Sequence, residues 1–103
     1  MWFSVGPLVS PAAGVVLADT GPVPGGGTVP LKIILTASAL ETALVQHRNA
    51  ANTVTLVEFT LRVPANDSRS LDLGSLTIAG DERIRMVQSG AATGNVHAMI
   101  AQE

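Results

Sequence analysis

Apolar and polar residues alternate in short runs along most of the chain, and polar turns separate these runs. Successive side chains of a β-strand point to opposite faces, so this alternation predicts half-buried strands. No segment of about ten residues or more follows the period of a helix. The predicted strands are Val15–Ala18, Val29–Ser38, Ala43–Asn49, Val54–Val63, Ser70–Leu73, Leu76–Ile78, Arg83–Gln88 and Val96–Gln102.

Residues that favour turns follow most of these runs. Arg48–Asn52, Pro64–Asp67 and Gly80–Asp81 are rich in Asn, Asp, Pro and Gly, which adopt turn conformations at low cost. The segment Ala37–Ala43 is too short for an independent helix and is interpreted as a connection. Eight short strands with such connections predict an all-β fold, an antiparallel β-sandwich or jelly roll.

The first 28 residues differ from the rest. The first thirty residues contain five of the six prolines and six of the ten glycines. Proline lacks a backbone donor, so this segment is a poor central strand. We therefore expect residues 1–28 to form an extended N-terminal arm, with a possible short strand at Val15–Ala18, and residues 29–103 to form the β-sandwich domain.

Two of the three aromatic residues, Trp2 and Phe3, lie at the start of this segment, and Leu8 and Val9 follow them. Large rigid side chains are frequent anchors at protein interfaces. We expect these four residues to contact a partner. The alternative is that the aromatic pair folds back over the domain's own sheet.

Size and composition favour one domain that associates with others. A chain of 103 residues forms a single core. It is 47% hydrophobic and only 14% charged, against roughly 25% in an average domain. We expect self-association to hide part of the apolar surface, although a robust monomer rich in Ala and Val remains an alternative.

Charge and composition also bear on the expected partners. The net charge is −2 and the basic residues are scattered along the sequence, so no nucleic-acid partner is expected. The chain has no run of about 18 apolar residues that could span a membrane, so no membrane partner is expected. The apolar start lacks the basic region of a signal peptide. The absence of cysteine excludes disulfides and thiolate metal sites.

One short motif suggests catalysis. Asp19-Thr20-Gly21 after an apolar run resembles the active-site motif of retroviral-type aspartic proteases, in which two chains each contribute one aspartate. Pro22 departs from that pattern, and Ile78-Ala79-Gly80-Asp81 does not match the family's later motif. A turn explains the motif equally well, so this protease is kept only as an alternative.

Other polar residues were weighed for chemistry. His47, His97 and Glu58 would make a metal site only if neighbouring strands brought them together. Arg83 and Arg85 alternate with Ile84 and are expected on one face of a strand, solvated or ion-paired with Asp81, Glu82 or Glu58. Gly25-Gly26-Gly27 is interpreted as a flexible linker. We expect no enzyme activity, no metal and no cofactor.

Four segments succeed one another as turns and strands: Gln46–Val54, Val63–Asn66 before a strand near Ser70, Ala79–Arg85, and Ala91–Ile100 before the terminal Glu103. In this order of turns and strands, residues 29–103 resemble the small β-sandwich virion proteins of tailed bacteriophages.

This resemblance implies a structural virion protein of the capsid decoration or cement type. It implies a homotrimer on the capsid surface with the major capsid protein as its partner. A neck or tail adaptor and a head-fibre module are the alternatives of the same class. A carbohydrate-binding sandwich is a further alternative, which the scarcity of aromatic residues disfavours.

Overall fold

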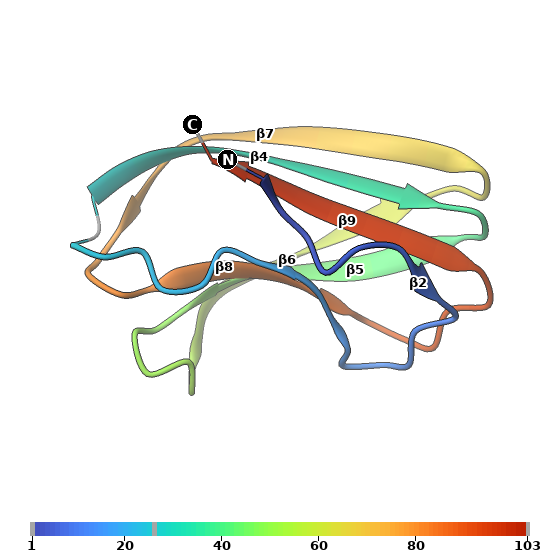
Figure 1. Cartoon of the computed structure of the whole chain (residues 1–103), viewed down its shortest axis with the longest axis horizontal. Coiled ribbons are helices and arrows are strands. Elements are labelled where there is room, and N and C mark those ends of the chain that lie inside the picture. The colour runs from blue at the N-terminus through green and yellow to red at the C-terminus, as the bar shows by residue number, and fades with distance from the viewer. Residues whose placement is uncertain (1, 26, 103) are drawn as a thin grey trace.

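The structure is a computed structural model that describes residues 2–25 and 27–102, except for the side chains of residues 27–30, 75, 76 and 102. Gly26 of the predicted linker and the terminal Glu103 lie outside the described residues. The described part contains nine strands in two antiparallel sheets (Figure 1). The strands are β1 Trp2–Phe3, β2 Leu8–Val9, β3 Val16–Asp19, β4 Gly27–Ala37, β5 Glu41–Arg48, β6 Thr55–Val63, β7 Asp67–Ile78, β8 Arg83–Gln88 and β9 Asn95–Gln102.

The two sheets have the strand order of a jelly roll. Sheet A runs β1-β9-β4-β7, with β2 also on β9, and sheet B runs β3-β8-β5-β6. The chain pairs with itself in four nested steps: β5 with β6, β4 with β7, β3 with β8, and β2 with β9. A long hairpin folded over on itself in this way gives the two-sheet jelly roll. The prediction of an all-β antiparallel sandwich or jelly roll is confirmed.

The core lies between the two sheets. The alternation of apolar and polar residues along each strand determines which side chains form it. Among the described side chains of β4 the buried ones are Leu31, Ile33, Leu35 and Ala37, and they alternate with more exposed neighbours. The facing positions of β9 are buried too, because Ile33 pairs with Ile100 and Leu35 with Ala98. Sheet B contributes mainly Leu17, Ala18, Ala43, Val45, Leu61, Val63, Ile84 and Met86.

The predicted turns are confirmed by their backbone conformations. Asn52, Asn66 and Asp81 have φ between 56° and 65°, in the left-handed region that Asn and Asp tolerate. Each lies in one of the three turn segments expected from the sequence. The described residues contain no helix long and apolar enough to cross a membrane.

The prediction of two strands at Ser70–Leu73 and Leu76–Ile78 is wrong in detail, because β7 is one strand with a bulge. The register changes from Leu31 paired with Gly74 to Lys32 paired with Asp72, which leaves Leu73 as an extra residue. Gly74 has φ +66°, and its amide donates to Asp72 Oδ1 at 2.7 Å. A glycine in this conformation makes a bulge without ending the strand.

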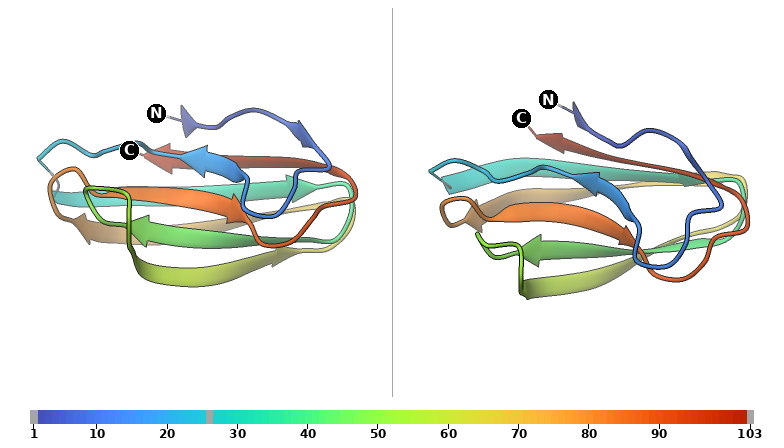
Figure 2. Two further views of the ribbon diagram at one scale, coloured as in Figure 1. Left: turned by 90° about the horizontal axis from the view of Figure 1, so that it is seen from below. Right: turned by 60° about the horizontal axis from the view of Figure 1, so that its bottom comes forward.

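The segment predicted as an arm lies along the sheets of its own chain. β1 and β2 pair with the two halves of β9, and β3 pairs with β8 (Figure 2). The loops between them are tied as well, since Ser10 N donates to Gly94 O and Gly14 N to Gln88 O. The short strand expected at Val15–Ala18 is present as β3. Docking of residues 1–28 on another molecule stays a prediction.

Candidate functional site

The four residues expected to contact a partner divide into two pairs. Phe3 and Leu8 are partly buried and pack against the core. Trp2 is 58% exposed and Val9 is 79% exposed, although both lie in strands paired with β9. Val5 between them is 54% exposed. We call Trp2, Val5 and Val9 the N-terminal strip, an apolar surface whose two ends, Trp2 and Val9, are on backbone paired with β9.

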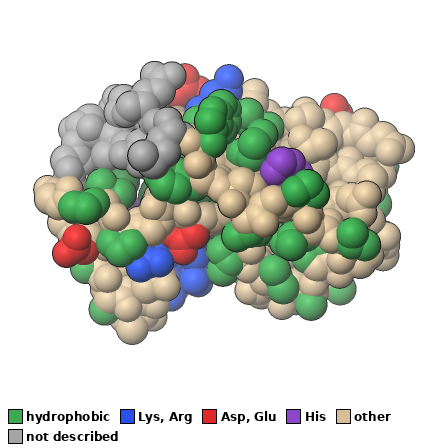
Figure 3. Space-filling view, viewed as in Figure 1, with side chains coloured by type: hydrophobic (Ala, Val, Ile, Leu, Met, Phe, Trp, Pro, Cys, Tyr) green, Lys and Arg blue, Asp and Glu red, His purple; other side chains and the backbone are tan. Residues whose placement is uncertain are grey.

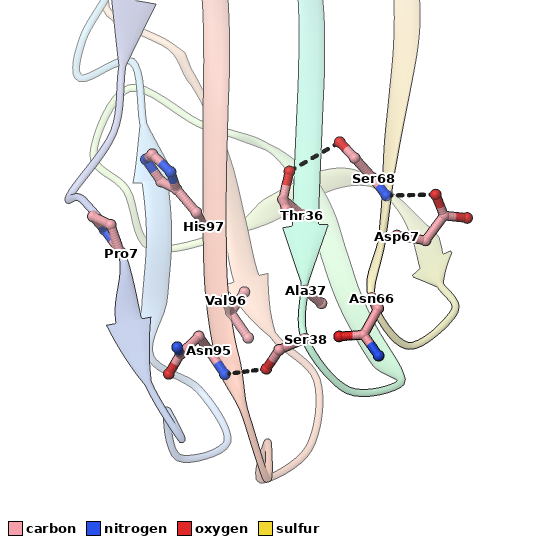
Figure 4. A pocket seen from close by; sticks show the side chains of 10 residues that line it. All are labelled: Pro7, Thr36, Ala37, Ser38, Asn66, Asp67, Ser68, Asn95, Val96 and His97. Carbon is pink, nitrogen blue, oxygen red and sulfur yellow. Dashed lines mark hydrogen bonds between the residues drawn. The ribbon is translucent and has the colours of Figure 1, made fainter.

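A groove of about 570 Å³ lies at one end of sheet A, between the segment before β2 and the ends of β4, β7 and β9 (Figure 4). His97 and Thr36 come from neighbouring positions of β9 and β4, and Ser68 lies opposite Thr36 on β7. The groove is lined by Pro7, Thr36, Ala37, Ser38, Asn66, Asp67, Ser68, Asn95, Val96 and His97.

Hydrogen bonds already use several polar groups of this groove. The hydroxyls of Thr36 and Ser68 are 2.9 Å apart, and Ser38 Oγ accepts from the Asn95 amide at 2.8 Å. His97 Nε2 lies 3.1 Å from Ser4 Oγ and so links β9 to the N-terminal segment.

The groove therefore offers hydroxyl and amide groups with one carboxylate. The imidazole of His97 also lines the groove, and its lining residues include no Phe, Tyr or Trp.

Asp19 of the protease-like motif is held as a structural residue. Its Oδ1 accepts from the Gly21 amide at 2.7 Å, which stabilises the turn after β3. Its Oδ2 accepts from Arg83 Nη1 at 3.2 Å. In proteases of the retroviral type the second carboxylate comes from a second chain, and within this chain the side chain paired with Asp19 is that of Arg83.

Arg48, which is distant in sequence, meets Arg83 and Arg85 on the outer face of sheet B. Arg48 of β5 lies opposite Arg83 of β8, and Arg85 lies two residues further along β8. Arg85 Nε donates to Gln46 Oε1 at 2.7 Å, and Gln46 Nε2 donates to Glu58 Oε2 at 2.8 Å. In Figure 3, basic and acidic side chains lie side by side at the lower left of the molecule.

We call this set the arginine row: Asp19, Gln46, Arg48, Glu58, Arg83 and Arg85. Arg83 and Arg85 share a face, as the alternation predicts. The expected acidic partners were partly wrong, because Arg83 pairs with Asp19, and Glu58 reaches Arg85 only through Gln46. Basic residues that look scattered in the sequence are thus clustered in the fold.

Within the arginine row, the charged form of Arg85 is disfavoured. Burial lowers the pKa of Arg85, and the nearby Arg48 and Arg83 lower it further, while Asp19 acts in the opposite direction. Three arginines face two carboxylates, so the formal charge of the row is 3 − 2 = +1. This is an ion-paired surface with a small positive excess.

The three residues considered for a metal site lie on different surfaces. His97 is on the outer face of sheet A, and Glu58 belongs to the arginine row. His47 Nε2 instead lies 3.0 Å from Glu82 Oε1. The Ala79 amide and His47 lower the pKa of Glu82. Across residues 2–25 and 27–102 no group of three His, Asp or Glu residues is placed to hold a metal ion.

Comparison with known proteins assigns no family to this chain. No family model matches the chain, and no curated protein matches it. Among solved structures, one described as "CBM4 structure and function" aligns with 94% of this chain and 82% of its own, at 16% identity and a TM-score of 0.46. The sheets, strand order and surfaces therefore rest on this chain's own geometry.

Proposed function

We propose that this chain is a non-catalytic structural protein of a phage virion that decorates the capsid surface and stabilises the shell. The observation that carries the proposal is the N-terminal strip. Trp2 and Val9 are largely exposed on backbone that is paired with β9, so their exposure is built into the fold. Ordered, exposed apolar side chains in one segment mark an interaction surface.

The fold supports this role only by analogy with other proteins that share the jelly-roll architecture. Jelly rolls are frequent in viral capsid proteins, but lectins and cupins use the same architecture. The expected partner is an apolar patch on the major capsid protein. Many copies bound to one shell would stabilise it by mass action. The homotrimer stays part of the proposal.

The groove of Figure 4 adjoins the segment that carries the N-terminal strip. Pro7 belongs both to the groove and to the segment that carries Val5 and Val9. A partner seated on the N-terminal strip would therefore reach the hydroxyl groups of Thr36 and Ser68 along the same side of sheet A.

The test is decoration of purified particles that lack this protein. Trp2→Ser combined with Val9→Ser is expected to reduce bound copies at least tenfold, because it removes the exposed apolar groups and leaves the backbone pairs with β9. Val54→Ser on the far side of the molecule is the matched control, since Val54 is similarly exposed.

Two results would overturn the proposal. One is full occupancy by the double variant. The other is the absence of the wild-type chain from purified virions when their proteins are identified by mass spectrometry. A copy number of a few per particle, rather than hundreds, would indicate that the chain is a neck or tail adaptor and that the N-terminal strip contacts a partner there.

A further inference from the structure

The two lateral sides of the sandwich are built differently. On one side the edge strands are short: β1 and β2 have two residues each and β3 has four. On the other side the edges are β6, with nine residues, and β7, with twelve (Figure 2). Long edge strands with free backbone groups invite pairing with another chain, and short or interrupted ones discourage it.

β7 is interrupted and β6 is regular over most of its length. β7 carries the bulge at Leu73 and Gly74. In β6 the register against β5 changes only beyond Val57, where Arg48 pairs with Thr55 and leaves Leu56 as the extra residue. Val57–Val63 is therefore an uninterrupted edge of seven residues, and its middle residue is Thr60.

Apolar side chains beside this edge are open to solvent. Val57 is 59% exposed, although its position faces the other sheet. A cavity of about 110 Å³ lies between Val57 and Phe59 of β6 and Leu73 of β7. The core is thus incompletely covered on this side within the described part of the chain.

The charges on the outer face of β6 make the edge complementary to itself. Glu58 and Arg62 are exposed and lie two residues on either side of Thr60. In an antiparallel pair of two β6 strands with Thr60 opposite Thr60, Glu58 lies opposite Arg62 of the second copy, twice over. Registers centred on Glu58 or Arg62 place like charges opposite each other, which is destabilising.

We infer that β6 is the contact between two copies of this chain, paired antiparallel across a two-fold axis at Thr60. The pairing joins two four-stranded sheets into one continuous sheet. On the inner face it places Phe59 opposite Leu61 and Val57 opposite Val63 of the second copy, so the exposed apolar groups become covered. An isologous contact of this kind closes at two copies.

This inference goes beyond the capsid role and does not depend on it, but it replaces the homotrimer of that proposal with a pair of copies. The test measures mass in solution by sedimentation for the full chain at several concentrations. Wild type is expected to reach the mass of two chains. Glu58→Arg or Arg62→Glu places like charges opposite each other, which should weaken association about tenfold or more.

Combining the two substitutions restores opposite charges and should restore association to within about threefold of wild type. An equal mixture of the two single variants should also associate, because one then carries two basic residues along the edge and the other two acidic residues. Arg69→Glu on β7 is the matched control and should associate like wild type. Unfolding curves of each variant report whether the domain is intact.

A wild-type protein that stays monomeric or forms only trimers overturns the inference. So does a dimer that neither single substitution weakens, or one that the double substitution fails to restore. The capsid decoration assay with the N-terminal strip variants is independent of all these results.

Discussion

Glu41 and Gln88 form a buried polar pair at one end of the core, in which Gln88 Nε2 donates to Glu41 Oε1 at 2.6 Å. Glu41 is only 2% exposed, and its Oε1 also accepts from the Thr42 amide. Within the described chain, Glu41 Oε2 and Gln88 Oε1 have no hydrogen-bond partner. Both are acceptors when the carboxyl group is ionised, so a proton on Glu41 removes a buried charge and supplies a donor.

This pair predicts that stability falls as the pH rises. Burial raises the pKa of Glu41 above 4.5, against smaller opposing effects of Gln88 and the Thr42 amide. A raised folded-state pKa means that the contribution of Glu41 is fully present below about pH 4.5 and is lost as the pH rises through the folded-state pKa. Glu41→Gln should therefore gain stability relative to wild type as the pH rises from 4 to 8, measured by urea unfolding.

Glu82 provides the control for that experiment. Its pKa is lowered, so its contribution is present above pH 4.5 and is lost as the pH falls. Glu82→Gln should change the dependence of the free energy of unfolding on pH in the opposite sense to Glu41→Gln. A stability profile of Glu41→Gln that runs parallel to that of wild type would contradict a raised pKa of Glu41.

The turn before β9 allows a sharp test of packing. A methyl group added at Gly94 would collide with Ser38 Oγ and would lie 3.2 Å from Ala39 Cβ. Ser38 cannot simply rotate away, because its hydroxyl accepts from the Asn95 amide. Gly94→Ala should cost about 1–3 kcal/mol in the free energy of unfolding. Gly90→Ala, where nothing lies within 4 Å, should cost less, and equal costs would contradict the predicted clash.

The sequence predicts most of the strands because their signal is local. Alternation in Val29–Ser38, Val54–Val63 and Arg83–Gln88 places those strands within two residues of their observed bounds. The first strand of the jelly roll escapes this reasoning, because it consists of two pieces of two residues separated by Gly6 and Pro7. Such pieces have no measurable period, and only pairing with β9 makes them strands.

The polar clusters could not be predicted because they depend on register. Asp19 and Arg83 are 64 residues apart and meet only because β3 pairs with β8. Glu41 lies in a segment that resembles a solvated connection, and nothing local marks it as buried. The arginine row likewise exists only once β8 lies beside β5.

Asp19 is predicted to act on stability through two separable contacts. Asp19→Asn keeps an acceptor for the Gly21 amide and loses the ion pair with Arg83, so it should cost about 1 kcal/mol or less. Asp19→Ala loses the turn bond as well and should cost roughly 0.5–1.5 kcal/mol more. Urea unfolding measures both variants.

Asp72→Ala is a matched control, because Asp72 Oδ1 accepts from the Gly74 amide in the same way and forms no ion pair among the described residues. It should cost about as much as the difference between the two Asp19 variants. Peptide hydrolysis by wild type that disappears in Asp19→Asn would revive the protease alternative.

Within the N-terminal segment, packing against the core and docking on a partner are predicted to depend on different residues. Phe3 and Leu8 pack against the core and Trp2 and Val9 do not. Phe3→Ala and Leu8→Ala should each cost about 1–3 kcal/mol, less than full burial would give, because both side chains are only partly buried.

Trp2→Ala and Val9→Ala should stay within about 0.5 kcal/mol of wild type in the same unfolding experiment. A large loss for Trp2→Ala would mean that the indole stabilises the monomer, and the N-terminal strip would then lose its claim as a docking surface. Deletion of residues 1–11 is the less informative experiment, because it removes both pieces of the strand from β9 and leaves the core positions beside Phe3 and Leu8 uncovered.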